Sequence, residues 1–427
     1  MTDFKNKKIA VWGYGHEGQS ALAYINSLGL EADIIIPDNE NTLPDYDIVI
    51  KSPGISIYGE KYREAAAKGV TFTTATNIFL QELKKAEQKP VTVAVTGTKG
   101  KSTTSALLAC ILTFLGKKVE LGGNFGVPLT DFIPKIKSGK LDYVVAEISS
   151  YQAADLQKGF DIALLNNLYP EHINWHLNHE NYYNDKLNLI RKSKVKILNA
   201  TDKKTAELLP SQGFPDVIYF NATDGFYVED EKLLYKGAEI LSLADTTLQG
   251  VHNLSNLAAV FTILKTLGID FAENEKSIKE AVKSFKPLPH RLEKVQSRDD
   301  SFIFIDDSIS TTPETAMAAL DVFKDKEVTL IAGGFERQQN YKELAEKIKK
   351  QNVRLVAMGT TGKRLFDEVT KVGGMVALVG NMREAVEMAK GISPKGSVIL
   401  LSPASPSYDE YKNFQERGED FKECVKM

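Results

Sequence analysis

Short apolar and β-branched runs alternate along the chain with longer segments whose apolar residues recur at helical spacing. This alternation is typical of parallel sheets covered by helices, so we predict an α/β fold. The predicted strands form three groups, at residues 9–12, 33–36, 47–51 and 70–73; 91–95, 143–147, 162–166 and 195–199; and 302–305, 328–332, 355–358, 376–379 and 398–401. The helices predicted between them include residues 102–115, 252–267 and 275–285.

Two breaks divide this pattern into three parts. The polar stretch 84–90 ends at Pro90, which opposes continuation of a helix, and residues 286–289 contain two further prolines. A chain of 427 residues is also too long for one hydrophobic core. We therefore predict three domains, at residues 1–89, 90–287 and 288–427.

Composition narrows the class of protein. Hydrophobic residues make up 43% and charged residues 26% of the chain, and the formal net charge is −3, so no basic excess favours a nucleic acid partner. Two cysteines do not suggest a disulfide framework. The longest apolar run, 106–115, is shorter than the roughly 20 residues that span a bilayer. We expect a cytoplasmic protein without membrane insertion.

A first glycine loop follows the strand at 9–12 and precedes a predicted helix. Its residues are Gly13, Tyr14, Gly15, His16, Glu17 and Gly18. This arrangement can direct backbone N–H groups and a helix N-terminus toward a diphosphate, and Asp38 could meet a ribose hydroxyl. The pattern does not separate NAD from another diphosphate ligand, and a glycine turn that only permits tight packing is the alternative.

A second glycine loop follows the strand at 91–95. Its residues are Gly97, Thr98, Lys99, Gly100, Lys101, Ser102 and Thr103. Lys101 would neutralise the β- and γ-phosphates of a nucleotide, and the Ser102 hydroxyl would bind Mg²⁺. Val95 stands where the complete phosphate-loop pattern has a glycine, which indicates a particular subset of these proteins.

Candidate metal ligands lie downstream of this loop. Glu147 ends a predicted strand, where it could reach a metal near Ser102. His172, His176 and His179 are spaced four and three residues apart, which also allows a structural zinc site. Without a nearby cysteine, a loop of exposed polar histidines is the more economical interpretation of His176 and His179.

Further short motifs occur along the rest of the chain. They are Gly-Gly-Asn-Phe-Gly at 122–126, Glu-x-Ser-Ser-x-Gln at 147–152, Gly-x-His-Asn-x-x-Asn at 250–256, Pro-His-Arg at 289–291, Leu-Ser-Pro-Ala-Ser at 401–405 and Asn-Phe-x-x-Arg-Gly at 413–418. In this order, and over essentially the whole chain, they resemble the Mur ligase family. The C-terminal motifs resemble its glutamate-adding members.

The resemblance implies both a fold and an activity. The expected architecture is an N-terminal Rossmann-like UDP-binding domain, a central P-loop ATPase-type parallel sheet and a C-terminal Rossmann-like domain that binds the amino acid. The expected reaction is the ATP-dependent addition of D-glutamate to UDP-N-acetylmuramoyl-L-alanine through an acyl phosphate, with ATP and two Mg²⁺ ions, by a monomer. The alternatives are addition of L-glutamate, or a catalytically inactive nucleotide-binding scaffold.

The resemblance also implies roles for individual residues. The catalytic set is Lys101, Glu147, His172, Lys186 and Arg291. ATP would contact residues 97–103 together with Asn253, Asn256, Arg291 and Asp307. The UDP precursor would contact residues 13–18 together with Asp38, Asn124, Ser149 and Gln152. Glutamate would contact Thr311, Arg337, Ser407 and Phe414. The metal ligands would be Ser102, Glu147, His172 and Lys186 as a carbamate.

Three positions depart from the common form of the glutamate-adding members. Ile309 stands where those members have a lysine that helps to bind glutamate, and Arg337 is the candidate replacement cation. Glu17 stands in the first glycine loop where the common form has a hydroxyl residue. Because the predicted glutamate pocket is altered, both D-glutamate and L-glutamate remain candidate substrates.

Overall fold

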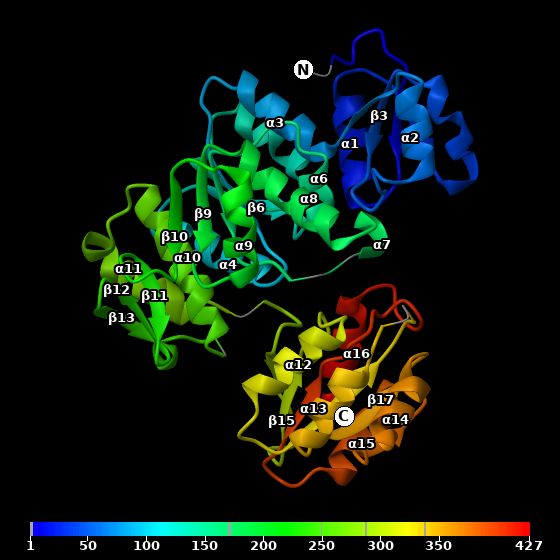
Figure 1. Ribbon diagram of the computed structural model, residues 1–427, viewed down its shortest axis with the longest axis vertical. Helices are drawn as coiled ribbons and strands as arrows, with labels where there is room; N and C mark the ends of the chain where they lie inside the picture. Colours follow the sequence, from blue (N-terminus) through cyan, green and yellow to red (C-terminus); the bar gives the residue numbers. More distant parts are fainter. Residues whose placement is uncertain (1–2, 170, 172, 249, 287, 337–338) are drawn as a thin grey trace. The chain divides into compact units, whose positions relative to one another are not determined.

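The computed structural model describes residues 3–169, 171, 173–248, 250–286, 288–336 and 339–427. These residues form two compact units, Met1–Phe285 and Lys286–Met427 (Figure 1). Both units are built from parallel sheets and helices, so the predicted α/β class is confirmed. The boundary between the units lies beside the predicted break at residue 287, whereas the predicted boundary at residue 89 lies inside the first unit.

The first unit begins with a four-stranded parallel sheet in the order β2-β1-β3-β4. Its strands are β1 (Ile9–Trp12), β2 (Asp33–Ile35), β3 (Ile48–Lys51) and β4 (Thr71–Thr73). The helical segments that accompany it are α1 (His16–Ser27), η1 (Pro37–Asp45), α2 (Glu60–Ala67) and α3 (Ala75–Lys85). Every residue of β1 and β3 is buried, as expected for central strands covered on both faces.

A six-stranded parallel sheet follows, in the order β10-β9-β8-β5-β7-β6. Its strands are β5 (Val91–Thr96), β6 (Val119–Gly123), β7 (Tyr143–Glu147), β8 (Ile162–Leu165), β9 (Val195–Asn199) and β10 (Val217–Phe220). The four central strands were predicted, and the two edge strands were not. The edge strand β10 has two exposed residues although its sequence, Val-Ile-Tyr-Phe, is a continuous apolar run. The other edge strand, β6, lacks such a run because it contains Glu120 and two glycines.

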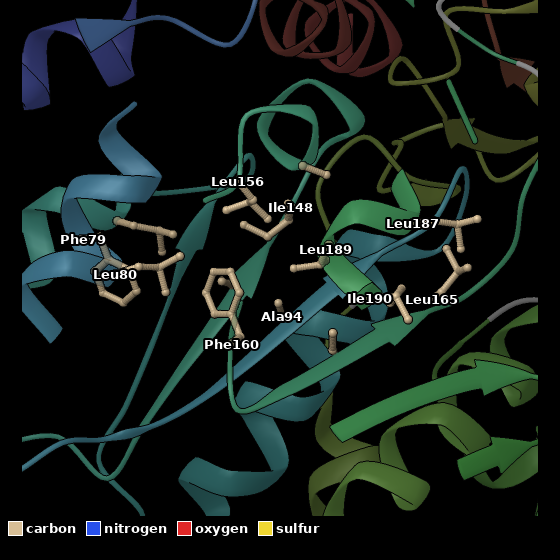
Figure 2. Close-up of a cluster of buried hydrophobic side chains, with 14 of the residues drawn as sticks. Phe79, Leu80, Ala94, Ile148, Leu156, Phe160, Leu165, Leu187, Leu189 and Ile190 are labelled. Atoms are coloured by element: carbon tan, nitrogen blue, oxygen red, sulfur yellow. The ribbon is translucent and has the colours of Figure 1, made fainter. Parts of the chain in front are cut away.

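Helices surround this second sheet, and several of them share a buried core with it. The helical segments are α4 (Lys101–Phe114), η2 (Leu129–Phe132), α5 (Ile133–Lys137), α6 (Ser150–Ala154), α7 (Ile173–His176), α8 (His179–Lys192), α9 (Lys203–Gln212), η3 (Leu243–Asp245), α10 (His252–Thr266) and α11 (Phe271–Ser284). Figure 2 shows Phe79 and Leu80 of α3 in the same buried cluster as Ala94 of β5 and Leu189 of α8. The last helix of the N-terminal segment therefore packs into the core of the second sheet.

A small antiparallel sheet completes the first unit. It joins β11 (Phe226–Glu229), β12 (Lys232–Tyr235) and β13 (Ala238–Ser242), and β12 packs against α10. None of these strands was predicted. Each is short, and the connections that join them are tight turns.

The second unit contains a six-stranded sheet in the order β14-β15-β19-β16-β17-β18. Its strands are β14 (Glu293–Val295), β15 (Ile303–Asp306), β16 (Val328–Gly333), β17 (Arg354–Met358), β18 (Met375–Leu378) and β19 (Val398–Leu401). Its helices are α12 (Pro313–Val322), α13 (Lys342–Lys350), α14 (Gly362–Lys371), α15 (Met382–Ile392) and α16 (Phe414–Lys426). The edge strand β14 runs antiparallel to β15 and was not predicted, whereas the other five were.

Two long apolar helices are buried in the first unit. α4 and α10 contain 14 and 15 residues and pack against each other. In the part of the chain that the structure describes, no helix combines the length and the apolar character that crossing a bilayer requires.

Candidate functional site

The second glycine loop connects β5 to α4 and opens toward the first turn of that helix. Gly100 is the N-cap of α4 with φ +81°, and no side chain caps the helix, so the first-turn amides are available to an anion. A Cβ atom at Gly100 would lie 2.5 Å from Asn256 Oδ1 and 2.9 Å from Asn166 Nδ2. Backbone conformation and close packing therefore both require glycine at this position.

Two lysines converge on the carbonyl of Gly97. Lys101 Nζ donates hydrogen bonds to Gly97 O and Thr98 O, both at 3.0 Å, and Lys186 Nζ donates to Gly97 O at 2.7 Å. Burial, and then the positive charge of Lys101, hold the pKa of Lys186 well below its usual value. A low pKa favours the neutral amine, which is the nucleophilic form of lysine and the form that reacts with carbon dioxide.

Glu147 supplies a buried carboxylate at the end of β7. Asn124 Nδ2 donates to its Oε1 atom at 2.6 Å, while Oε2 is buried without a hydrogen-bond partner. An unsatisfied carboxylate oxygen out of water favours a bound cation, and oxygen atoms are the ligands that Mg²⁺ prefers. With the Ser102 hydroxyl in the first turn of α4, these donors fit a Mg²⁺ ion, and a carbamate on Lys186 would add a further anionic ligand. The predicted ligand His172 lies outside the described residues.

The segment after β8 braces the second glycine loop. Thr98 Oγ1 donates to Tyr169 O at 3.0 Å and lies 2.8 Å from Tyr182 OH, and Lys99 N donates to Asn167 Oδ1 at 2.8 Å. These contacts join the loop to two neighbouring chain segments. They restrain the conformation of the loop.

The two asparagines predicted on the adenine side lie in the first turns of α10. Asn256 Nδ2 donates to Asn253 Oδ1 at 2.9 Å, and Thr104 Oγ1 of α4 donates to Asn256 Oδ1 at 3.2 Å. The structure therefore brings both asparagines beside the second glycine loop.

The first glycine loop connects β1 to α1 and lies near a different group of predicted residues. Gln152 Nε2 donates to Glu17 Oε1 at 2.7 Å, and Gln152 Oε1 accepts from Ser149 N at 2.8 Å and lies 3.1 Å from Ser149 Oγ. Three residues predicted to contact the UDP precursor thus form one hydrogen-bonded chain. Tyr14 and His16 are exposed, and the side chain of Asp38 lies outside the described residues.

His176 was expected to be exposed in a loop, and this expectation is wrong. The residue is fully buried at the end of α7, because Nδ1 lies 2.6 Å from Asp185 Oδ2 and Nε2 lies 3.0 Å from Ser150 Oγ. Both ring nitrogens are occupied by protein groups, which argues against the zinc alternative. His179 is exposed, as expected, at the first position of α8.

The buried polar network around His176 has little local signal in the sequence. Tyr58 OH donates to both oxygens of Asp185 at 3.1 Å, and Asp185 directly precedes Lys186 on α8. Lys51, at the end of β3, forms an ion pair of 2.7 Å with Asp155, and its side chain is 0% exposed. The only sequence signal for Lys51 was a charged residue that ends an otherwise apolar strand.

In the second unit, the predicted ATP-side carboxylate of Asp307 is buried directly after β15. Ser402 Oγ donates to its Oδ2 atom at 2.8 Å, and Leu292 N donates to Oδ1 at 3.3 Å. Burial raises the pKa of Asp307 to about 7, although these donors, Ser310 and the charge of Arg291 act in the opposite direction.

The residues predicted to contact glutamate lie near a buried arginine that was not among the predicted site residues. Arg417 Nε donates to Ser308 Oγ at 3.1 Å, Nη2 donates to Ser308 O at 2.9 Å, and Nη1 donates to Ser405 O at 3.0 Å. It thereby joins the segment that leads to Thr311 with the segment that leads to Ser407. The first residue of α16, Phe414, is half-buried, and Arg337 lies outside the described residues.

Comparison with known proteins agrees with these features. Residues 95–264 match the pattern of the Mur ligase middle domain, and residues 290–405 match the Mur ligase, glutamate ligase domain. The chain is 33% identical to a UDP-N-acetylmuramoyl-L-alanine--L-glutamate ligase of Xanthomonas oryzae, covering 99% of this chain and 95% of the relative. Relatives of the same name from Xylella fastidiosa and a Micromonospora species are 34% and 31% identical, over 97% and 100% of this chain and 94% and 98% of theirs.

Solved structures share the fold at low identity. The UDP-N-acetylmuramate-alanine ligase MurC of Thermotoga maritima aligns with a TM-score of 0.60 at 20% identity, covering 98% of this chain and 99% of its own. MurF of Acinetobacter baumannii aligns with a TM-score of 0.64 at 16% identity, covering 86% and 90%. The chain therefore belongs to the Mur ligase family and is an ATP-dependent amide ligase of peptidoglycan precursor synthesis.

Proposed function

We propose that this chain joins L-glutamate to the alanine carboxyl group of UDP-N-acetylmuramoyl-L-alanine. The observation that carries the proposal is the match, over at least 97% of this chain, to relatives whose names contain both substrates. The expectation of D-glutamate rests on the common members of the family. We give more weight to these relatives because their match includes the second unit, where we place the glutamate site.

Amide formation from a carboxylate requires activation, since a carboxylate oxygen is a poor leaving group. The alanine carboxylate attacks the γ-phosphorus of ATP, the bond from that phosphorus to the bridging oxygen breaks, and ADP leaves. The amino nitrogen of glutamate then attacks the carbonyl carbon of the acyl phosphate. The carbon–oxygen bond breaks, phosphate leaves, and the nitrogen loses a proton. Such a reaction depends on positioning and charge stabilisation, and no side chain has to act as a nucleophile.

We assign the ATP-side roles to the second glycine loop and its neighbours. Residues 97–103 hold the phosphates of ATP. When ATP binds, the ammonium group of Lys101 gives up its hydrogen bonds to Gly97 O and Thr98 O and neutralises phosphate charge instead. Ser102, Glu147, His172 and carbamylated Lys186 hold two Mg²⁺ ions, which lower the cost of gathering phosphate and carboxylate charges. The unpartnered Oε2 atom of Glu147 supports this set, as does the low pKa of Lys186.

We assign the precursor to the first glycine loop with Asp38, Asn124, Ser149 and Gln152. Residues 1–89, 90–287 and 288–427 would then serve the UDP precursor, ATP and glutamate respectively. In the second unit, Arg291 and Asp307 serve ATP. The glutamate contacts are Thr311, Arg337, Ser407 and Phe414. We expect the enzyme to act as a cytoplasmic monomer.

The test is phosphate release together with mass analysis of the product, using ATP, Mg²⁺, the precursor and each glutamate enantiomer separately. We expect release and a product heavier by one glutamyl residue with L-glutamate only. The Lys101→Met variant, prepared in the same way, controls for contaminating ATPases and should release phosphate about 10²–10³-fold more slowly. Activity with D-glutamate only would refute the proposed enantiomer, and activity with neither would refute glutamate as the substrate.

A further inference from the structure

The carboxyl group of Glu17 has an unusual position at the start of α1. Its Oε1 atom accepts a hydrogen bond from Gln152 Nε2 at 2.7 Å, while its Oε2 atom is buried and has no hydrogen-bond partner. An ionised carboxylate in this position would leave a charged oxygen without water or a donor, which is costly. Burial accordingly raises the pKa of Glu17 to about 7, although the Gln152 hydrogen bond and the charge of Lys51 lower it.

The same turn of α1 presents donors to an anion. Gly15 is the N-cap of α1, and no side chain caps the helix, so the first-turn amides have no side-chain acceptor. Glu17 is the acidic residue of this first turn. A diphosphate bound to these amides would be repelled by an ionised Glu17, whereas a neutral acid could donate a hydrogen bond to it.

We propose that Glu17 binds the diphosphate of the UDP-linked precursor as a neutral carboxylic acid, with Oε2 donating a hydrogen bond to a phosphate oxygen. This inference rests on the proposed function, which places that diphosphate in the first glycine loop. The protonated oxygen replaces the hydroxyl that the common form of the family carries at this position. Gln152 orients the group by occupying Oε1.

Of the groups around Glu17, we expect Glu17 itself to change its protonation when the precursor binds. Lys51, from β3, is the cation that faces it, and Lys51 is paired at 2.7 Å with Asp155, which follows α6. Gln152, from α6, is neutral. On α1 itself, the exposed His16 directly precedes Glu17, so it requires a control.

The experiment is calorimetric titration of the full-length protein with UDP-N-acetylmuramoyl-L-alanine, without ATP or glutamate, at pH 6, 7 and 8. If only the neutral acid binds, the wild-type Kd rises about tenfold between pH 6 and pH 8, following a pKa of about 7. At pH 8 binding takes up nearly one proton, which is measured by repeating the titration in buffers of different ionisation enthalpy.

Two variants test the assignment. Glu17→Gln keeps the shape, the acceptor for Gln152 and an N–H donor at every pH, so it should bind with a flat pH profile and no proton uptake. His16→Gln should keep the wild-type slope, whatever its own affinity. A wild-type slope that persists in Glu17→Gln, or that disappears in His16→Gln, would overturn the proposal.

Other outcomes separate this inference from the proposed function. Precursor binding with a flat wild-type pH profile would overturn the role of Glu17 and leave the proposed substrate intact. Absence of precursor binding at every pH would overturn the proposed substrate, and the inference with it.

Discussion

Replacing Asp155 with asparagine is expected to destabilise the first unit by about 3 kcal/mol, because the change leaves the Lys51 cation without its carboxylate. The ion pair measures 2.7 Å, and the two side chains are 0% and 9% exposed. Lys51 Nζ also donates to Ile55 O at 2.7 Å and to Ser52 O at 3.3 Å. These two carbonyls remain in the variant, so the loss should lie at the lower end of the roughly 3–5 kcal/mol seen when one partner of a buried pair is removed.

Replacing Lys51 instead of Asp155 is expected to destabilise the first unit by a similar amount, for a different reason. Lys51→Met leaves the Asp155 carboxylate buried, where desolvation already raises its pKa and the nearby charge of Asp185 raises it further. The double variant Lys51→Met/Asp155→Leu removes both charges, so it should recover to within about 1 kcal/mol of the wild type. This recovery would distinguish a desolvated ion pair from ordinary packing, for which the two losses would add.

Urea denaturation followed by tryptophan fluorescence measures these changes. The chain has two tryptophans, Trp12 and Trp175, and both lie in the first unit, so the signal reports on that unit. Because Lys51 Nζ lies 5.6 Å from the Trp175 ring, circular dichroism should confirm each midpoint. The exposed pair Lys232–Glu239 is the control, and Glu239→Gln should leave the midpoint unchanged. A loss below about 1 kcal/mol in Asp155→Asn would refute the reasoning.

Three further predictions concern the proposed site. Lys101→Met should lower kcat in phosphate release by about 10²–10³-fold because it removes a cation that stabilises phosphate charge, and near-normal turnover would contradict the assignment. Lys186→Ala should lose activity and regain part of it with added short-chain carboxylates, since these replace the carbamate; no rescue at any Mg²⁺ concentration would count against that role. Asp307→Asn should stabilise the second unit at pH 8, as followed by scanning calorimetry. The wild-type carboxyl has a raised folded-state pKa of about 7, so its unfavourable contribution grows by up to about 4 kcal/mol as the pH rises from about 4 to 7. If Asp307→Asn has the wild-type pH profile of stability, that carboxyl is not buried as a neutral acid.

The sequence predicted the central strands well because burial on both faces leaves a continuous apolar run. The strands β1, β7, β9 and β19 match their predicted bounds to the residue. The edge strands β6 and β14 lack that run. The edge strand β10 has it, as Val-Ile-Tyr-Phe, and was missed nonetheless. The glycine loops were predictable for a similar reason, since their conformation restricts the residue types that can form them.

Side-chain partners brought together from distant parts of the chain could not be predicted in the same way. His176 is buried because Asp185 and Ser150 occupy its two nitrogens, and Ser150 lies on another helix. Nothing in the local sequence distinguishes this histidine from the exposed His179. Lys51 and Asp155 pose the same difficulty, because they lie far apart in the sequence and only the fold brings them together.

The crowding around Gly100 has an evolutionary consequence. A side chain at this position would meet Asn256 and Asn166, which belong to two other segments of the chain. Smaller residues at both asparagine positions would relieve these contacts but not the positive φ of Gly100. We therefore expect relatives to keep glycine here even where the asparagines differ. Evolution can thus reshape the neighbours of this glycine while the glycine itself stays fixed by its own backbone.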